Sequence, residues 1–329
     1  MRTAILRGVL AVGATVVALG GVEAALRLSG ADRRAVNRAL YYLTVDEDVH
    51  EPDPGFLQYR LKPGAEGHYQ GRWGPYDVHI GPLGDRGGQL PVDPVPGHVR
   101  IGVLGGSTVY GAEVSDEQAL PAALQRGLRA RGVMADVGNF GTSAWVTAQM
   151  AFRGREILAH QLDLLILIHT NEGPRPFLMP PDLAAADFSP WFRSDPRRWL
   201  EHLPPRLPIS ADLQVRLLQA SATWRYLHAA LRGDGDAALP YAAARGREQV
   251  RLLQQTADIL GVPVLYLLWP EGWDGWPDDL PVSVRDATID LDALVEDPAL
   301  KVEHPPPEGL AWYGELLADL LVTADTTGP

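Results

Sequence analysis

The chain contains no cysteine among its 329 residues. This absence excludes disulfides, thiolate zinc sites, iron–sulfur clusters, a cysteine nucleophile and a lipidated cysteine. Positive charge is also scarce, because 29 lysines and arginines stand against 41 aspartates and glutamates, a formal net charge of −12. Nucleic-acid-binding proteins usually carry a basic surface, so this balance argues against a nucleic-acid partner.

The remaining composition is that of a folded globular protein. Apolar residues make up 46% and charged residues 21% of the chain, whereas a disordered chain has lower hydrophobicity and higher net charge. The length allows one large domain or two modest ones. We find neither an internal repeat nor a low-complexity tract in the sequence.

The N-terminus has the pattern of a targeting segment. Arg2 and Arg7 precede an uncharged, mostly apolar run over residues 8–22, and Glu23 interrupts that run. A membrane span needs about 20 apolar residues, so residues 1–29 fit either a cleaved signal peptide or an uncleaved signal anchor. We predict a single-pass membrane anchor with the rest of the chain outside the cytoplasm, in the periplasm or on the cell surface.

Two regions follow the N-terminal segment. Residues 30–98 are rich in proline and glycine, which predicts an irregular arm with one short strand over residues 76–80. Residues 99–325 alternate apolar runs with helical patterns, which indicates βαβ units and a parallel sheet covered by helices on both faces. We predict strands over residues 99–104, 134–139, 162–168 and 262–269, and helices over residues 115–131, 147–160, 211–231, 241–260 and 308–322.

One segment breaks this alternation. Residues 172–210 contain many prolines and four large aromatic residues, which predicts a lid-like insertion. A second segment, residues 269–276, sets tryptophans beside carboxylates, a combination that suits either stacking on sugar rings or ordinary packing of a surface loop. Its acidic residues do not have the spacing of metal ligands, so we predict neither a metal nor a cofactor.

Polar residues follow three of the predicted strands. Open parallel sheets bind ligands beyond the carboxyl ends of their strands. Gly105, Gly106 and Ser107 follow the first strand, residues 139–144 (Asn-Phe-Gly-Thr-Ser-Ala) end the second, and Asn171 follows the third. Taken singly, each of these segments fits an ordinary turn. His304 stands in a proline-rich loop before the last helix, where a catalytic loop residue could lie.

Together these segments resemble the four sequence blocks of the SGNH/GDSL hydrolase family, in the right order. The blocks match residues 103–111, 138–144, 164–172 and 304–309. Residues 51–54 and 60–64, after the N-terminal segment, are similar to a membrane-anchored bacterial subgroup of this family. The resemblance implies a flavodoxin-like three-layer α/β/α sandwich and hydrolysis of an acyl ester of a saccharide or a lipid.

The resemblance also implies roles for particular residues. Ser107 would be the nucleophile and His304 its general base. The backbone amides of Ser107 and Ala144 and the side-chain amide of Asn171 would form the oxyanion hole. Two alternatives share this site: an O-acyltransferase, and a catalytically impaired protein that binds a glycan or a lipid.

The chain departs from the family pattern at several positions. Lys301 stands where members carry the aspartate that orients the histidine, and an ammonium group cannot accept the imidazole proton. A backbone carbonyl, Glu303 or Asp297 could take over that role. His169 replaces a glycine, which predicts a bulky side chain beside the oxyanion site, and Gly106 stands where many members have aspartate.

Overall fold

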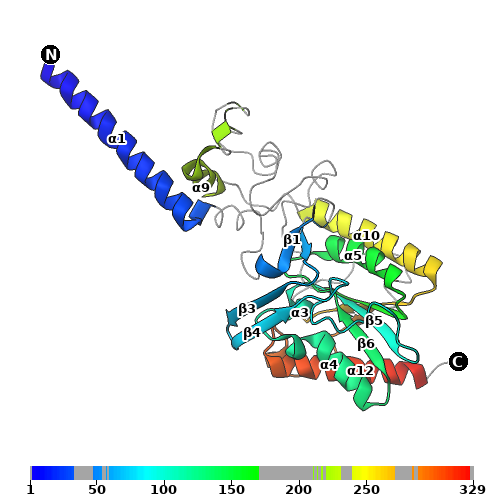
Figure 1. Ribbon diagram of the computed structural model, residues 1–329. Coiled ribbons are helices and arrows are strands. Elements are labelled where there is room, and N and C mark those ends of the chain that lie inside the picture. Colours follow the sequence, from blue (N-terminus) through cyan, green and yellow to red (C-terminus); the bar gives the residue numbers. More distant parts are fainter. Residues whose placement is uncertain are drawn as a thin grey trace.

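A five-stranded parallel sheet forms the centre of the computed structural model (Figure 1). The structure describes residues 2–32, 47–53, 57, 59–169, 210, 213, 216–217, 220–230, 239–270, 284 and 288–326. The strands lie in the order β6-β5-β7-β8-β9. Their bounds are Val99–Leu104 (β5), Ala135–Asn139 (β6), Leu164–His169 (β7), Val264–Leu268 (β8) and Thr288–Asp290 (β9).

In chain order the five strands read 2-1-3-4-5, which is the flavodoxin-like arrangement. The predicted fold class is therefore confirmed at the level of an α/β fold with a parallel sheet. Four of the strands match the predicted runs within two residues at each end. The short edge strand β9 was not predicted, since a three-residue strand carries too little periodic signal.

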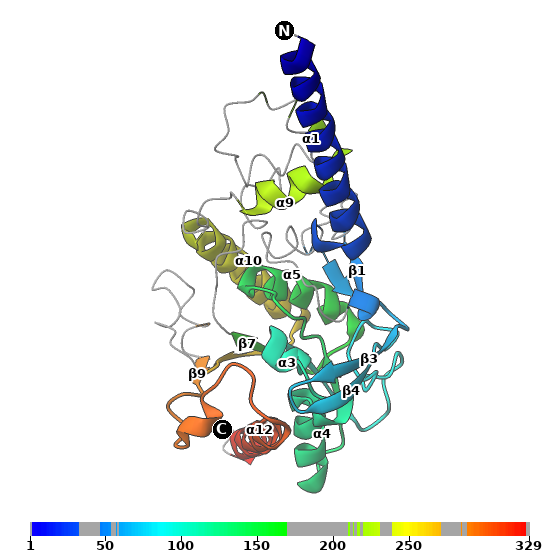
Figure 2. The ribbon, with the colours of Figure 1, turned by 90° about the vertical axis from the view of Figure 1, so that its left-hand side faces the viewer.

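Helices cover both faces of the sheet (Figures 1 and 2). On one face α4 (Leu120–Ala130) packs beside α12 (Pro307–Thr326), and on the other α5 (Thr147–Ile157) packs beside α10 (Leu239–Leu260). The side chains of β7 divide between the two cores by alternation. Leu165 and Leu167 join the α5 and α10 side, while Ile166 and Ile168 join the α4 and α12 side. Burial on both faces explains why this strand reads as one apolar run.

The helix predicted over residues 115–131 is broken in the structure. A 3-10 turn, η2 (Asp116–Gln118), comes first, Ala119 is extended, and α4 then begins with a proline in its first turn. Proline suits a helix start because the first amides have no intrahelical acceptor. The predicted capping box is present: the Ser115 amide donates to the Gln118 side-chain oxygen at 3.0 Å.

The arm is more regular than predicted. It contains two antiparallel hairpins, β1 (His50–Pro52) with β2 (Tyr59–Leu61), and β3 (Glu66–Gly71) with β4 (Gly74–His79). The predicted strand over residues 76–80 corresponds to most of β4. Proline and glycine in this stretch mark the turns between short strands.

Arg86 fixes the arm to the sheet domain. Its buried guanidinium forms a 2.7 Å ion pair with Asp116 and donates to the carbonyls of Tyr110 and Gly111 at 2.7 and 2.6 Å. It also lies 4.5 Å from the centre of the Tyr110 ring. A buried charge is stable only when it is paired and hydrogen-bonded, and Arg86 meets both conditions. The carbonyls that it binds lie at and just after the end of the short helix α3 (Ser107–Tyr110).

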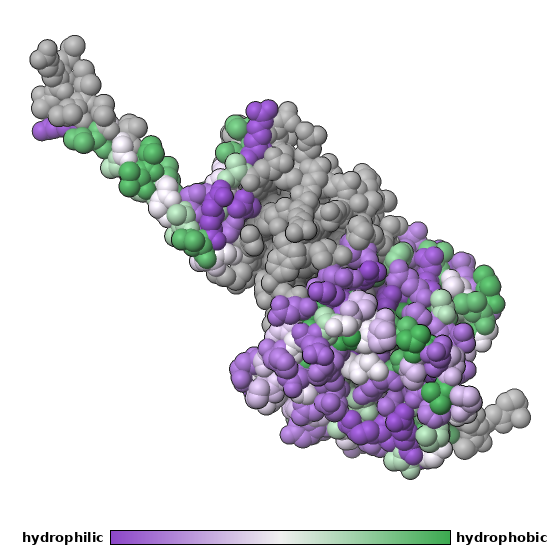
Figure 3. Space-filling model, in the orientation of Figure 1, coloured by the Kyte–Doolittle hydropathy of each residue, from purple (hydrophilic) through white to green (hydrophobic). Residues whose placement is uncertain are grey.

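The N-terminal segment forms one helix, α1 (Arg2–Ser29), as predicted. Exposed apolar side chains run along it (Figure 3), namely Leu10, Val16, Val17, Leu19, Val22 and Leu28. In the part of the chain that the structure describes, no helix has both the length and the apolar character needed to cross a membrane. The prediction that this segment spans a membrane is therefore not supported, and the predicted location of the chain stays a prediction.

Glu23 interrupts the apolar run and has a structural partner. Its carboxylate accepts hydrogen bonds from the Ser221 hydroxyl at 2.9 Å and from the amides of Ala222 and Thr223 at 2.8 and 2.9 Å. These groups form the start of α9 (Ala222–Ala230), whose first amides lack intrahelical acceptors. The charge that shortens the apolar run therefore caps a second helix.

Candidate active site

Ser107 lies at the carboxyl end of β5, at the first residue of α3. The turn into α3 needs a glycine at position 105, because a Cβ there would lie 2.7 Å from Val109 Cβ. Within residues 101–111 every residue except Ser107 is buried. The fold thus exposes one hydroxyl at the end of a buried strand.

His304 lies against this hydroxyl. Its Nε2 atom is 2.6 Å from Ser107 Oγ, within hydrogen-bonding distance. The histidine is half-buried, in the segment that joins the 3-10 turn η6 (Pro298–Leu300) to α12. The structure therefore brings together two predicted site residues that are 197 positions apart in the chain.

Two hydrogen bonds to backbone carbonyls hold the segment before His304. The hydroxyl of Thr108, next to Ser107, donates to the carbonyl of Glu303 at 2.7 Å. The indole N–H of Trp269 donates to the carbonyl of Val302 at 3.0 Å. The backbone on the N-terminal side of His304 is thus held by α3 and by the residue that follows β8.

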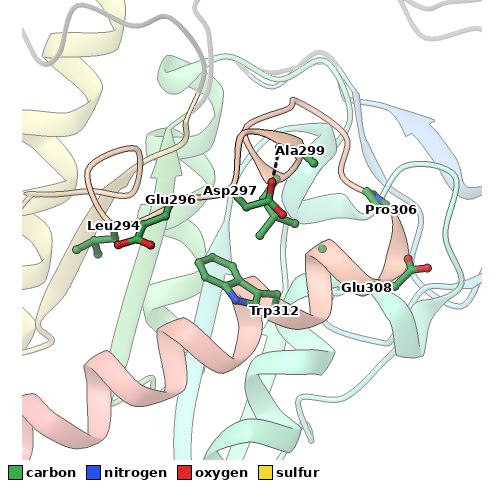
Figure 4. Close-up of a pocket in the computed structure, with 9 residues that line it drawn as sticks. Leu294, Glu296, Asp297, Ala299, Pro306, Glu308 and Trp312 are labelled. Atoms are coloured by element: carbon green, nitrogen blue, oxygen red, sulfur yellow. Dashed lines mark hydrogen bonds between the residues drawn. The ribbon is translucent and has the colours of Figure 1, made fainter.

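The side chains of Lys301, Asp297 and Glu303 do not bond the His304 ring. The Lys301 ammonium lies 3.0 Å from the Asp292 carboxylate. Asp297 accepts from the Ala299 amide at 2.9 Å and so caps η6 (Figure 4). Glu303 is exposed and contributes its carbonyl to Thr108.

Over the residues that the structure describes, the His304 ring has one hydrogen-bond partner, Ser107. In this part of the chain the arrangement is a serine–histidine dyad without a carboxylate on the second ring nitrogen.

The segment that follows β6 brings a backbone amide to the same end of the sheet. Gly141 is required here, because a Cβ would lie 2.8 Å from the Val109 carbonyl carbon in α3. The Thr142 amide donates to the Gly105 carbonyl at 3.1 Å, which joins this segment to the turn before Ser107. Within residues 135–151 Ala144 is the one residue that is not buried.

Ala144 has a left-handed backbone, with φ of +61°. Glycine adopts this conformation without strain, whereas a residue with a Cβ is disfavoured there. A glycine would therefore suit position 144 better than the alanine present. In the described part of the chain, neither the Ala144 amide nor the Ser107 amide has a hydrogen-bond acceptor. Both amides can therefore serve a ligand.

His169 lies at the end of β7 and is fully buried. Its ring hydrogen-bonds the hydroxyl of Thr147, the first residue of α5. Burial lowers the pKa of His169 to about 3, so its imidazole is neutral at physiological pH. The bulky side chain predicted at position 169 is thus a buried, neutral ring that bonds the first residue of α5.

Several predicted features fall outside the described residues. They are Asn171, the lid-like segment over residues 172–210 except for Ser210, and the tryptophan-rich residues 271–276. Trp269, the first tryptophan of that segment, is described and is buried, with its ring centre 4.2 Å from that of Tyr313. Trp269 is therefore a packing residue, which agrees with the packing alternative for this segment.

A cavity of about 600 Å³ lies beside the start of α12 (Figure 4). The half-exposed ring of Trp312 points into it between Leu294 and Asp297. Its remaining lining residues come from the segment around η6 and from the first turn of α12: Glu296, Ala299, Leu300, Pro306, Glu308 and Gly309.

Two of the three comparisons with known families and proteins found no match. The chain matches neither a family model nor a curated protein. Similar solved structures include a lipolytic protein of the G-D-S-L family from Desulfitobacterium hafniense DCB-2, with 12% identity, 68% of this chain and 99% of that chain covered, and a TM-score of 0.38.

Two further structures are similar at the same level. TesA shows 14% identity, covers 68% of this chain and 97% of its own, and has a TM-score of 0.36. The SGNH-hydrolase family esterase AlinE4 shows 14% identity, covers 70% and 98%, and has a TM-score of 0.32. The two neighbours whose family is named belong to the G-D-S-L and SGNH-hydrolase families. At such identities and TM-scores the assignment of the site rests on its own geometry.

Proposed function

We propose that this chain is a serine ester hydrolase of the SGNH type that cleaves an acyl ester of a saccharide or a lipid. The observation that carries the proposal is the 2.6 Å contact between Ser107 Oγ and His304 Nε2. A serine hydroxyl is a weak nucleophile at neutral pH and needs an adjacent base, which His304 supplies. Ser107 is also the one residue of residues 101–111 that is not buried, which supports access of a substrate to it.

The reaction would proceed through an acyl-enzyme. Ser107 Oγ attacks the ester carbonyl carbon while its proton passes to His304 Nε2. The imidazolium then returns that proton to the departing alcohol oxygen as the carbon–oxygen bond breaks. In the second half, His304 takes a proton from water, the hydroxide attacks the acyl carbon, and Ser107 leaves with the proton restored.

Backbone amides would stabilise the negative oxygen of each tetrahedral intermediate. The amides of Ser107 and Ala144 are free to donate to it within the described part of the chain. The side chain of Asn171 is the third donor that the family resemblance implies. Removing one such donor typically lowers the rate by about 10²–10³.

The dyad would work with backbone support in place of an aspartate. Thr108 and Trp269 hold the segment before His304, which keeps the imidazole at Ser107. These two residues fix the position of the imidazole, but they do not neutralise the positive charge of the imidazolium. Loss of the aspartate's function in a serine protease costs about 10⁴ in turnover, so we expect a slow esterase that prefers activated esters.

The test is labelling by a fluorophosphonate together with hydrolysis of a chromogenic acetyl ester. We expect labelling of the wild type, and loss of both signals in Ser107→Ala and in His304→Ala. Ser29→Ala is the matched control, because that hydroxyl bonds a carbonyl within α1, and it should behave as wild type.

Two outcomes would contradict the proposal. A wild type that is neither labelled nor active would favour a glycan- or lipid-binding protein. Labelling that persists in Ser107→Ala would assign the reaction to another residue. Acyl transfer to an added alcohol in preference to water would keep the site and make the enzyme an O-acyltransferase.

A further inference from the structure

The arm reaches the proposed oxyanion site through Tyr59. This residue lies on β2 and is fully buried, and its hydroxyl donates a 2.8 Å hydrogen bond to the backbone carbonyl of Ser143. The two residues are 84 positions apart in the chain. Ser143 directly precedes Ala144, so its carbonyl and the Ala144 amide belong to one peptide group.

The geometry of a peptide group links the two atoms. In a planar trans peptide the carbonyl oxygen and the amide hydrogen point in opposite directions. A donor that fixes the Ser143 oxygen therefore also fixes the direction of the Ala144 N–H. It polarises the group as well, because a hydrogen bond at the oxygen makes the amide a stronger donor.

This peptide group needs external support. Ala144 is in the left-handed region, which an alanine adopts only at a cost in free energy. Rotation of the peptide would relieve that strain and turn the N–H away from the substrate. The Tyr59 hydrogen bond opposes such a rotation.

Tyr59 is itself held in place. Its ring packs 6.3 Å, centre to centre, from the ring of Trp145, the residue after Ala144. The Gln149 side chain donates to the carbonyl of Leu57 at 2.8 Å, and Gln149 lies in the first turn of α5. The hydroxyl is thus presented from a fixed backbone.

We propose that Tyr59 is a positioning residue for the oxyanion hole, acting through the Ser143–Ala144 peptide. The inference rests on the proposed function, because it assigns Tyr59 to the oxyanion amide of that site. It makes the arm part of the active site, where removing one hydroxyl group weakens catalysis without changing substrate access.

The experiment compares Tyr59→Phe with the wild type on a chromogenic acetyl ester and on the matching thionoester. The change removes the hydroxyl and keeps the ring. We expect kcat on the oxygen ester to fall about 10-fold with KM within twofold, a fraction of the effect of losing a whole oxyanion donor. Sulfur is a weak hydrogen-bond acceptor, so kcat on the thionoester should fall less than threefold.

Tyr266→Phe is the matched control. Tyr266 is a buried tyrosine of β8 whose hydroxyl donates to Gln254 at 3.0 Å, away from Ser107. Loss of the Tyr266 hydroxyl should leave the ratio of kcat on the oxygen ester to kcat on the thionoester unchanged. A damaged or partly unfolded enzyme loses both activities equally, so the ratio separates positioning from stability.

A second readout does not depend on turnover. In protein labelled with ¹⁵N-alanine, the Ala144 amide proton resonance is identified by its absence in Ala144→Gly. We expect it to move upfield in Tyr59→Phe, since the peptide loses polarisation.

The outcomes separate the two proposals. Unchanged kcat and an unchanged Ala144 resonance in Tyr59→Phe, with Ser107 still labelled, would overturn the role of Tyr59 and leave the hydrolase intact. An equal loss on both esters would make Tyr59 merely structural. Labelling that survives Ser107→Ala would overturn the proposed function and, with it, this inference.

Discussion

The Thr108 hydroxyl donates a 2.7 Å hydrogen bond to the carbonyl of Glu303, which joins the residue after the proposed nucleophile to the residue before the proposed base. Thr108 is buried, so water cannot readily replace this bond. The contact ties α3 to the segment before α12. It supplies part of the positioning that an aspartate would give in a triad.

Replacing Thr108 with valine should therefore weaken both catalysis and stability. The isosteric side chain removes the donor and leaves the Glu303 carbonyl without this partner, for a loss of about 1 kcal/mol in unfolding free energy. We expect the rate of fluorophosphonate labelling to fall about 10-fold. Thr256→Val is the control, because that hydroxyl bonds a carbonyl within α10, and it should label at the wild-type rate. Equal labelling of both variants would show that this bond does not position His304.

Restoring an aspartate at position 301 should not by itself raise activity. The Lys301 side chain is directed to Asp292 at 3.0 Å, so a new carboxylate would meet a like charge there. We expect Lys301→Asp to change ester turnover by less than threefold. Asp297→Asn and Glu303→Gln should also stay within threefold of wild type, because neither carboxylate contacts His304. An increase of tenfold or more in Lys301→Asp would show that the new side chain does reach the imidazole.

Ala144→Gly should stabilise the protein and retain its activity. The left-handed backbone costs an alanine roughly 1–2 kcal/mol, and the greater freedom of glycine in the unfolded chain offsets about 0.4–1 kcal/mol of that. We expect a net gain of about 0.5–1 kcal/mol in urea denaturation, with kcat within twofold because the amide remains. Ala148→Gly lies inside α5, where glycine is unfavourable, so this variant should lose unfolding free energy. A loss of stability in Ala144→Gly would contradict the left-handed backbone.

Asp85 should make stability fall with rising pH. Burial raises the pKa of this carboxyl to about 6, against a partly compensating hydrogen bond from the Leu90 amide at 3.1 Å. Between about pH 4 and 6 the folded state keeps a proton that the unfolded state has released, so the Asp85 contribution to stability is present at low pH and is lost as pH rises. A shift of about two pKa units corresponds to about 3 kcal/mol at most.

The measurement for Asp85 is the unfolding free energy of wild type and Asp85→Asn at pH 4 and pH 6.5. Relative to wild type, the variant should gain up to about 3 kcal/mol over that interval, because asparagine does not titrate. Asp93→Asn changes an exposed aspartate of the same arm, so its unfolding free energy should change between pH 4 and pH 6.5 as much as that of wild type. An equal change in unfolding free energy between pH 4 and pH 6.5 for wild type and Asp85→Asn would contradict the raised pKa of Asp85.

The sequence by itself determined the elements that depend on local pattern. The apolar runs predicted four of the five strands, because a strand buried on both faces needs a continuous apolar segment. Ser115 and Gln118 marked a helical start through their spacing alone. Ser107 and His304 could be predicted as site residues because the short sequence blocks around them resemble those of the SGNH/GDSL family.

Only the tertiary structure decided how distant residues support that site. The sequence offered Asp297, Glu303 or a backbone carbonyl as an acceptor for the His304 ring in place of an aspartate. Among the described residues none of them bonds that ring, and the support comes instead from Thr108 and Trp269, which bind the carbonyls of Glu303 and Val302 before His304. The structure also shows that the hydroxyl of Tyr59, a residue of the arm, donates a hydrogen bond to the Ser143 carbonyl. Local periodicity and capping follow from neighbours within a few residues, so they can be read from the chain. A hydrogen bond between residues 84 or 195 positions apart exists only once the sheet and the arm have packed together.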